Sequence, residues 1–525
     1  MKQKNYKEYI ANFLPCIGYS ILTGIFTGIT IFFFKFLAGR AENLSRTLYF
    51  LAKESWLTVI LTFVVLAALA LLMSFLHKIV PECKGGGIPR SEGILRGILP
   101  IRWKKTLVCT FVGSMISFFA GLPCGSEGPA VLMGTTLGRM TGKVSKKRTG
   151  WTRHVMTSGA SAGFAVATGA PLSGILFALE EIHKRIAPVL VLTVSMAVLT
   201  ATGTNLILCS LFDTSPVLFH LPNLPAFELS HVGYLILLGV LISLFVALFD
   251  SSILWFRKFA HVEKKGPVPV KLLVTFGLTG ILGLYMADGT YSGHHMIDHV
   301  LEHNMTLGLL LLLLVIRLLM MLFITDSGAT GGIFIPTLAI GVLAAAIITK
   351  LLLLLGMPEE LSTAVIFLGM CAFIGGTLRA PITATVLFIE LSGQFSALFY
   401  IAIVVFVVSL ITELFNLTPF YDAALEEMAE AHHHGKERKI GRFVLHISPT
   451  DFAVGKSVRN VLWPHASVIE SITHSENHSL EEMDDGEQRL YAGDKVVLRA
   501  AYYDEQEIFK LLRGIAGDDV EMEKI

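Results

Sequence analysis

The amino-acid sequence predicts an all-α polytopic membrane protein with two repeated halves and broken helices, followed by a small C-terminal α+β domain. Composition is the first observation behind this fold class: of 525 residues, 53% are hydrophobic and only 16% are charged, and the mean hydropathy is +0.65. Soluble globular chains carry about 25% charged residues, so a soluble protein is excluded. The other two observations are interrupted apolar segments and an internal sequence repeat.

The apolar segments begin near the N-terminus, where three lysines precede an apolar stretch over residues 10–37 that is too long for a signal-peptide core. By the positive-inside rule, we expect these lysines to lie in the cytoplasm. Several later segments are shorter than the roughly 20 residues that a full crossing needs, and Gly or Pro interrupts others, so we expect broken and re-entrant helices. The later segments lie at 56–76, 106–122, 155–182, 188–212, 232–256, 270–287, 305–324, 337–356, 364–374 and 397–416.

A glycine- and proline-rich pattern occurs twice along the chain. The sequence GSEGP at 125–129 matches GIFIP at 332–336, with an offset of 207 residues. A second pair agrees, because the Ala-Pro pair and the glutamate within 170–180 recur within 380–390 at an offset of 210. Chance similarity is the alternative, but two nearly equal offsets in the same order oppose it. Interrupted helices in corresponding places indicate a transporter whose site lies at the repeat interface.

Glu127 is the only Asp, Glu, Lys, Arg or His between Lys105 and Arg139. A lone carboxylate at membrane depth is costly unless it faces water, a partner or a substrate path. Because Pro129 suits the first turn of a helix, we expect Glu127 at a helix start, where free N–H groups and a partial positive charge attract anions. The carboxylate then occupies an anion site and is released by protonation. The alternative is a glycine-rich kink with a protonated structural glutamate.

Two further glutamates, Glu180 and Glu181, close an apolar run over 172–179, just before three basic residues. For Glu180, a solvated helix end at the cytoplasmic surface is an equally weighted alternative.

The hydropathy changes after the last apolar segment. Residues 423–439 are charged and are predicted to form a helix that leads to a linker over 431–441. Because no acidic or cysteine ligands adjoin His432, His433 and His434, we interpret them as solvated and expect no metal site and no cofactor.

Residues 442–525 are predicted to form the small α+β domain. Its expected elements are strands at 443–447, 467–473 and 495–499, a turn at 492–494 and a helix at 505–512.

Four motifs follow one another along the chain. They are Gly85-Gly86-Gly87-Ile88-Pro89, Gly125-Ser126-Glu127-Gly128-Pro129, Gly332-Ile333-Phe334-Ile335-Pro336, and Tyr421 in Thr418-Pro419-Phe420-Tyr421. Together they resemble the CLC chloride channel and transporter family over roughly residues 10–430. The resemblance implies a transmembrane anion transport domain over 1–430, with inverted repeats at about 50–215 and 230–420, in a homodimer with one pathway per subunit.

The resemblance also implies roles for individual residues. The anion path is implied to be lined by Gly86, Ile333, Phe334 and Tyr421. Glu127 is implied to be the external gate and proton carrier, and Glu181 the internal proton acceptor that marks exchangers, with Glu180 as an accessory. The physics agrees, because backbone N–H groups at a helix start and a tyrosine hydroxyl donate hydrogen bonds without a full positive charge, so a bound anion can leave.

Two positions depart from the family pattern. Chloride-selective members usually have Ser where this chain has Gly86, which leaves the preferred anion open between chloride, nitrate and fluoride. Many members have Arg or Lys where Ser126 stands, so we expect different electrostatics at the external side.

The tail over about 442–514, with Val454-Gly455-Lys456-Ser457 and Gly493-Asp494, resembles the RCK-C (TrkA-C-like) subdomain of potassium-conductance regulators. This resemblance implies a cytoplasmic regulatory or dimerising module that binds a small ligand such as a cyclic dinucleotide.

The leading hypothesis is therefore a secondary active transporter of the plasma membrane that exchanges Cl⁻ or another small anion for H⁺, with both termini in the cytoplasm. The closest alternative is a passive voltage- or pH-gated anion channel of the same fold, and an exchanger selective for nitrate or fluoride ranks below it. An intramembrane enzyme would need a second catalytic group near Glu127, and the sequence contains no nucleophile–base pair or HExxH motif. Besides the ions, the expected partners are the lipid bilayer and a second copy of the chain; no nucleic acid is expected.

Overall fold

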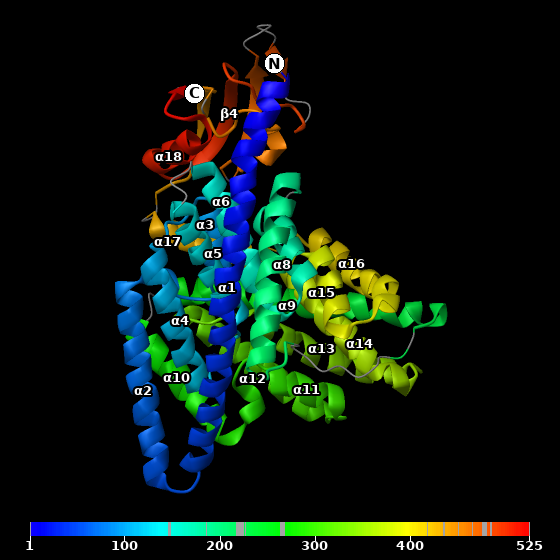
Figure 1. Cartoon of the computed structure of the whole chain (residues 1–525). Helices are drawn as coiled ribbons and strands as arrows, with labels where there is room; N and C mark the ends of the chain where they lie inside the picture. The colour runs from blue at the N-terminus through cyan, green and yellow to red at the C-terminus, as the bar shows by residue number, and fades with distance from the viewer. Residues whose placement is uncertain are drawn as a thin grey trace.

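The computed structural model describes the helical body and most of the C-terminal domain. α1 (Lys2–Ala52) begins beside the C-terminal domain and runs along the length of the molecule (Figure 1). Within the described part of the chain, nine helices are long and apolar enough to cross a membrane. The described residues are 2–144, 149–184, 186–216, 225, 227–262, 268–416, 418–433, 436–449, 451–464, 466–474, 480–482 and 486–523.

The helices form two sets that correspond to the two predicted repeats. After α1, the first set contains α2 (Trp56–Ile79), α3 (Ile88–Leu95), α4 (Trp103–Ala120), α5 (Glu127–Val144), α6 (Thr149–Thr168), α7 (Pro171–Phe177) and α8 (Pro188–Leu211). The second set contains α9 (Val232–Val262), α10 (Val268–Tyr285), α11 (His294–Glu302), α12 (Leu307–Ser327), α13 (Phe334–Leu354), α14 (Ser362–Leu378), α15 (Pro381–Ser392), α16 (Leu398–Leu414) and α17 (Phe420–His432).

The expected helix breaks are confirmed. The predicted segment over 155–182 divides into α6 and α7 at Gly169, which has a φ of +71° and is followed two residues later by the proline that starts α7. The second set repeats this break 210 residues later, where Arg379 has a φ of +57° and Pro381 starts α15. Proline cannot continue a helix from the preceding turn, and the left-handed residue turns the chain before it.

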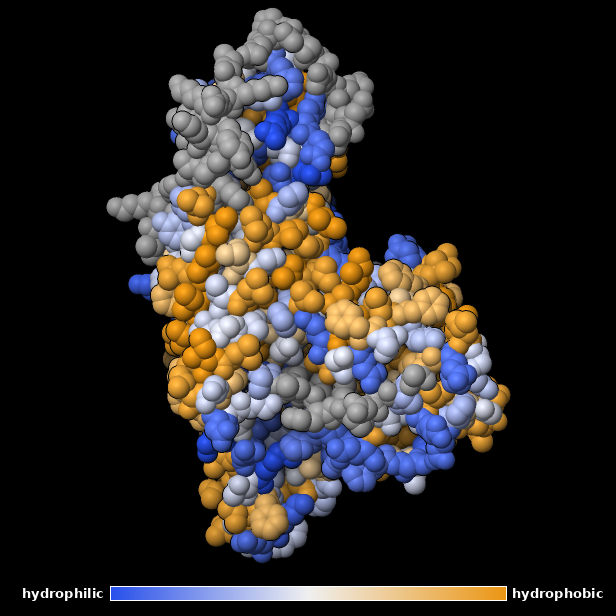
Figure 2. Space-filling model, turned by 45° about the vertical axis from the view of Figure 1, so that its right-hand side comes forward, coloured by the Kyte–Doolittle hydropathy of each residue, from blue (hydrophilic) through white to orange (hydrophobic). Residues whose placement is uncertain are grey.

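The helices form an inner and an outer layer. In α14, with the turn that precedes it, 89% of the most apolar window is buried inside the protein, whereas in α2 only 22% is buried. Apolar side chains nevertheless cover much of the helical surface (Figure 2). Exposed apolar surface of this extent identifies the outer helices as the lipid-facing layer.

In its described residues, the C-terminal domain is a five-stranded antiparallel sheet with one α-helix. The strand order is β3-β2-β4-β1-β5, and the strands predicted at 443–447, 467–473 and 495–499 are confirmed as β1, β2 and β4. The elements are β1 (Lys439–His446), β2 (Ser467–Thr473), β3 (Leu480–Glu482), β4 (Lys495–Tyr502), α18 (Glu505–Ala516) and β5 (Val520–Glu523).

This domain is packed against the membrane part of the protein. Arg153 of α6 donates hydrogen bonds to the carbonyl oxygen of Leu95 at 2.7 and 3.0 Å and to that of Leu462, in the C-terminal domain, at 2.6 Å. Cys16 of α1 and Trp151 of α6 belong to the same buried apolar cluster as the sheet. The tail is therefore attached to the helices by a continuous core.

The interpretation of the three histidines His432, His433 and His434 as solvated is wrong for His433. Its side chain is buried, with 6% of the residue exposed, and its ring stacks on Tyr503 with centroids 4.5 Å apart. Sequence proximity could not predict this, because the covering residues come from the distant C-terminal domain. His434 lies outside the described residues.

Candidate anion and proton pathway

The two copies of the repeated glycine motif meet each other in the centre of the helical body. Gly125 and Gly332 form an antiparallel bridge, in which each backbone N–H donates to the other residue's carbonyl oxygen at 2.7 Å. The 207-residue offset between the motifs therefore corresponds to a direct contact. The pseudo-symmetric halves of the protein face each other at this point.

The first glycine motif packs against the second at backbone distance. A Cβ on residue 128 would overlap the carbonyl oxygen of Gly86, and a Cβ on residue 87 would overlap that of Gly128. Gly87 also has a φ of +82°, a conformation that other residues rarely adopt. These glycines are needed because the loops approach one another without room for side chains.

Each of the four motifs stands at the start of a helix, which the sequence predicts for the three glycine motifs but not for Tyr421. The helices begin at Ile88, Glu127, Phe334 and Phe420, one residue before Tyr421. A helix start presents N–H groups without intrahelical partners and a partial positive charge. The arrangement can therefore stabilise an anion without a fully charged side chain.

Glu127 is completely buried at the start of α5, with 0% of its surface exposed. Its Oε1 accepts a hydrogen bond from the hydroxyl of Ser126 at 3.1 Å, whereas its Oε2 has no hydrogen-bond partner among the described residues. The carboxylate is folded over Gly125, beside Ile335 and Pro336 at the start of α13. It thus lies between the helix starts of both repeats.

Tyr421 is buried as well, with 1% exposed, and its hydroxyl has no hydrogen-bond partner in the described part of the chain. It interacts electrostatically with both Glu127 and Glu181, and its helix α17 packs on α3. Gly86 and Ile333 are neighbours, because a Cβ on residue 86 would lie 3.6 Å from the Ile333 side chain. A buried polar group without a hydrogen-bond partner, such as the Tyr421 hydroxyl, is suited to an ion path.

Phe334 contributes an apolar wall. It is 2% exposed, and its ring packs edge-on against Phe164 with centroids 5.3 Å apart; Phe164 in turn stacks on Phe177.

Glu181 lies in a π-helical turn over Ala178–Ile182, directly after α7. It is 1% exposed, and its Oε2 has no hydrogen-bond partner among the residues that the structure describes. The nearby charges that act on it belong to Glu92, Arg96, Lys184 and Asp422.

Three of these charged residues, Arg96, Lys184 and Asp422, line a cavity of about 460 Å³. Lys184 pairs with Asp422 at 2.7 Å, and Arg96 lies 3.7 Å from the same carboxylate and also pairs with buried Glu92. The cluster provides a polar connection from the cavity toward Glu181.

Glu180 has a different environment from Glu181. Its carboxylate accepts hydrogen bonds from the backbone N–H groups of Ile382 and Thr383, at 2.9 and 2.6 Å, and so caps the start of α15. Glu390 caps the start of α7 in the same way, at 2.7 and 2.8 Å. The reciprocal caps reproduce the 210-residue offset and favour a structural role for Glu180.

Sequence analysis missed two charged residues that lie near the candidate site, Lys35 and Glu92. The ammonium group of Lys35 donates to the carbonyl oxygens of Val166 and Ala167, at 3.2 and 3.0 Å, and interacts electrostatically with Glu127. The signal was available, because Lys35 is the only charged residue of the apolar stretch over 10–37. Glu92 lies just after the first glycine motif.

Broken helices whose N-termini meet inside a membrane-spanning body, together with buried carboxylates, define a membrane protein that moves ions. The family model described as "Voltage gated chloride channel" matches residues 69–413. The chain belongs to this family, the CLC family, as its motifs predict. Members of the family are transporters or channels, and the chain is not an enzyme.

Named relatives cover most of the chain. The "H(+)/Cl(-) exchange transporter ClcA" of Vibrio cholerae serotype O1 (strain M66-2) is 32% identical over 422 residues, which are 77% of this chain and 88% of the relative. The protein of the same name from Salmonella schwarzengrund (strain CVM19633) is 30% identical over 420 residues, which are 78% and 88%. A solved slow cyanobacterial Cl⁻/H⁺ antiporter has a TM-score of 0.73 and 26% identity, covering 79% of this chain and 98% of that one.

Proposed function

We propose that the protein is a secondary active transporter that exchanges Cl⁻, or another small anion, for H⁺ across the plasma membrane. The observation that carries the proposal is the pair of buried carboxylates, Glu127 and Glu181, which both interact electrostatically with Tyr421 and each have one oxygen that lacks a hydrogen-bond partner among the described residues. A buried carboxylate without a full set of partners is costly when charged, so it is suited to taking up and releasing a proton. The names of the bacterial relatives agree with this function.

In this mechanism Glu127 is the external gate and the shared carrier. When charged, its carboxylate competes with an anion for the N–H groups at the starts of α5 and α13. When protonated, it no longer needs those N–H groups and can turn away, which admits an anion. Mutual exclusion of anion and carboxylate couples the two ions.

Glu181 accepts protons from the cytoplasm through the cavity that Lys184 and Asp422 line. Gly86, Ile333, Phe334 and Tyr421 line the anion path. Because Gly86 contributes no hydroxyl, the preferred anion among chloride, nitrate and fluoride is set by the backbone and by neighbouring groups.

The assembly and orientation are part of the same proposal. The N-terminal part of α1 and the C-terminal domain share one core through Cys16, which supports a common side of the membrane for both. By the positive-inside rule, this side is proposed to be the cytoplasm. The functional unit is a homodimer with one pathway per subunit, and the tail is an RCK-C-like regulatory domain that binds a small ligand such as a cyclic dinucleotide.

The test is the reversal potential of the purified protein in liposomes under crossed anion and pH gradients. An exchanger gives a reversal potential that depends on both gradients, and an imposed anion gradient moves protons uphill. A reversal potential that follows the anion gradient alone would overturn the proposal and favour a passive channel of the same fold.

A further inference from the structure

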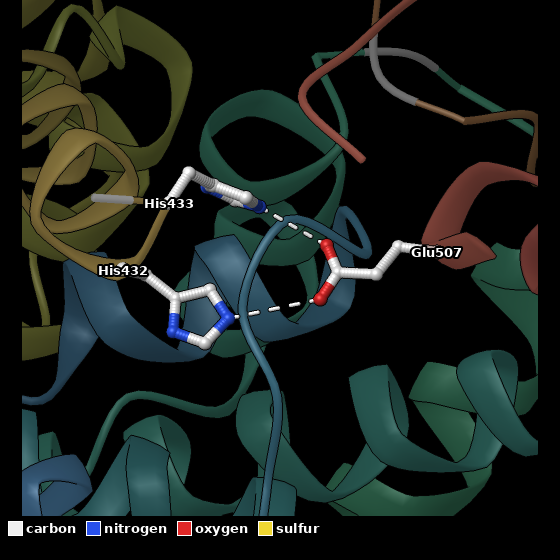
Figure 3. Close-up of side chains that lie close together, drawn as sticks. All are labelled: His432, His433 and Glu507. Carbon is white, nitrogen blue, oxygen red and sulfur yellow. Dashed lines mark hydrogen bonds and ion pairs between the residues drawn. The ribbon is translucent and has the colours of Figure 1, made fainter. Parts of the chain in front are cut away.

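Two histidines and a glutamate converge where the membrane part meets the C-terminal domain. His432 is the last residue of α17, His433 follows it, and Glu507 lies in the first turn of α18; Figure 3 shows both rings directed at the carboxylate. The Nε2 atom of His433 lies 3.0 Å from one carboxylate oxygen, and that of His432 lies 3.7 Å from the other. The three ligand atoms all lie within 4.8 Å of one another.

The hydrogen bonds of His433 fix which of its ring nitrogens carries a proton. Its Nδ1 lies 2.8 Å from the carbonyl oxygen of Ala429, which can only accept a hydrogen bond, so Nδ1 is the donor. In a neutral ring, Nε2 then carries a lone pair and faces a carboxylate oxygen, which is also an acceptor. Such a contact at 3.0 Å needs a cation between the two atoms, either a proton or a metal ion.

The third residue favours the metal ion. A proton bridges one pair of atoms, whereas His432 is directed at the second carboxylate oxygen at a distance too long for a hydrogen bond. Two ligands of a tetrahedral metal with bonds of about 2.0–2.1 Å lie about 3.4 Å apart, so small side-chain movements complete the set.

The surroundings match those of known metal sites. A metal-binding histidine usually donates its second N–H to a carbonyl group, as His433 does. His433 is largely buried, and both it and Glu507 line the cavity of about 460 Å³, through which water can reach a fourth ligand position. Two imidazoles and one carboxylate are a donor set that zinc and related ions prefer.

We propose that His432, His433 and Glu507 bind one divalent transition-metal ion of the zinc class at the junction of α17 and α18. The ion joins the C-terminal end of the helix that carries Tyr421 to the first turn of α18, the tail's only α-helix in the described part of the chain. The same cavity is lined by Asp422 and Lys184. The metal therefore stabilises the docked tail and places positive charge at the cytoplasmic entrance.

The binding test uses the full chain, purified in detergent without a polyhistidine tag and stripped with a chelator. It is titrated with Co²⁺ alone, followed by the visible d–d absorption of tetrahedral cobalt, and then with Zn²⁺ in competition. We expect one ion per chain, and affinity at least about tenfold weaker in His433→Gln and in Glu507→Gln. His446→Gln, in β1 of the same domain, is the matched control and keeps wild-type affinity.

Equal binding of Co²⁺ by the wild type and all three variants would mean adventitious surface binding and would overturn the proposal. So would the absence of stoichiometric uptake, which is the result for a protonated His433–Glu507 pair. Size-exclusion chromatography checks that each variant is folded; if one substitution disrupts folding, the other still gives the comparison.

A second measurement concerns transport and rests on the proposed function. In liposomes, Zn²⁺ on the side of the tail is expected to change the proton flux of the wild type and of His446→Gln, but not that of Glu507→Gln. Absence of any coupled transport would count against the proposed function alone, because the cobalt titration reports the metal site independently.

Discussion

At the residue scale, the position of Glu127 balances two opposing effects. The start of α5 favours a negative charge, because of its free N–H groups, whereas complete burial disfavours one. Electrostatic interaction with Lys35 adds to the first effect. Because these two effects oppose each other, the Glu127 carboxylate can gain or lose a proton when an anion arrives or leaves, since the anion interacts with the same N–H groups.

Glu127→Gln is expected to imitate the protonated state permanently. Anion flux should persist and lose most of its pH dependence, while proton movement is abolished, because the amide carries no exchangeable charge. Flux of both ions in liposomes measures this. Glu413→Gln is the control, since that side chain is 84% exposed at the surface; uphill proton transport by the Glu127 variant would make Glu127 a structural residue.

Glu181→Gln is expected to uncouple proton flux from anion flux. The change removes the buried proton acceptor but leaves the anion path, so anion flux should continue and proton flux should fall to background. Proton pumping driven by an anion gradient is the measurement. Normal pumping in this variant would assign proton entry to another group, of which buried Glu92 is the first candidate.

Gly86→Ser is expected to raise the preference for chloride, because the new hydroxyl donates a hydrogen bond into the anion path. The structure has room for it: the nearest atom to a Cβ at this position is 3.6 Å away, an ordinary contact. Ratios of Cl⁻, NO₃⁻ and F⁻ flux measure the effect. Gly128→Ser is the contrasting variant and should fail to fold, because its Cβ would overlap the Gly86 carbonyl; unchanged ratios in Gly86→Ser would show that residue 86 does not set selectivity.

At the element scale, the reciprocal caps connect the two halves of the protein. Glu180 follows α7 and caps α15, while Glu390 ends α15 and caps α7. The sequence predicts that these glutamates are equivalent, because they share the 210-residue offset. It could not predict that each caps the other half, since an offset contains no information about how two repeats are oriented.

Removing both caps is expected to destabilise the protein. In a Glu180→Gln, Glu390→Gln double variant, each lost charged cap should cost about 0.5–2 kcal/mol, and the two effects should be similar because the sites are equivalent. Thermal unfolding of the purified single and double variants in detergent measures this. Unequal single effects, or wild-type stability in the double variant, would contradict the symmetric role.

Helix starts and strands were predictable to the extent that local residues determine them. Pro171 and Pro381 mark two helix starts, and β2 has the predicted bounds. The short strand β3 and the terminal strand β5 were not predicted, because their positions depend on pairing with β2 and β1. The charged cluster around Glu181 was likewise hidden, since its members come from three separate segments.

At the scale of the whole molecule, the tail forms one wall of the cavity that is proposed as the cytoplasmic entrance. The cavity beside Glu181 is lined on one side by Lys184 and Asp422 and on the other by residues of β4 and α18, including Tyr502 and Glu507. The groups proposed to bind and exchange ions, from Glu127 to Glu181, all belong to the membrane part. In the proposed mechanism, the tail therefore adjusts access of protons without taking part in the anion path.

Deletion of residues 436–525 is expected to leave a folded dimer that still carries anions. Proton flux should change more than anion flux, because the deletion removes one wall of the cavity while the helix starts around Glu127 remain. Some loss of stability is also expected, since Arg153 loses its hydrogen bond to the Leu462 carbonyl and Trp151 loses its covering. Anion and proton fluxes of the truncated and full-length proteins in the same liposomes test this. A truncated protein that assembles as a dimer but carries no anion would make the tail essential for transport, because the remaining path contains all four motifs.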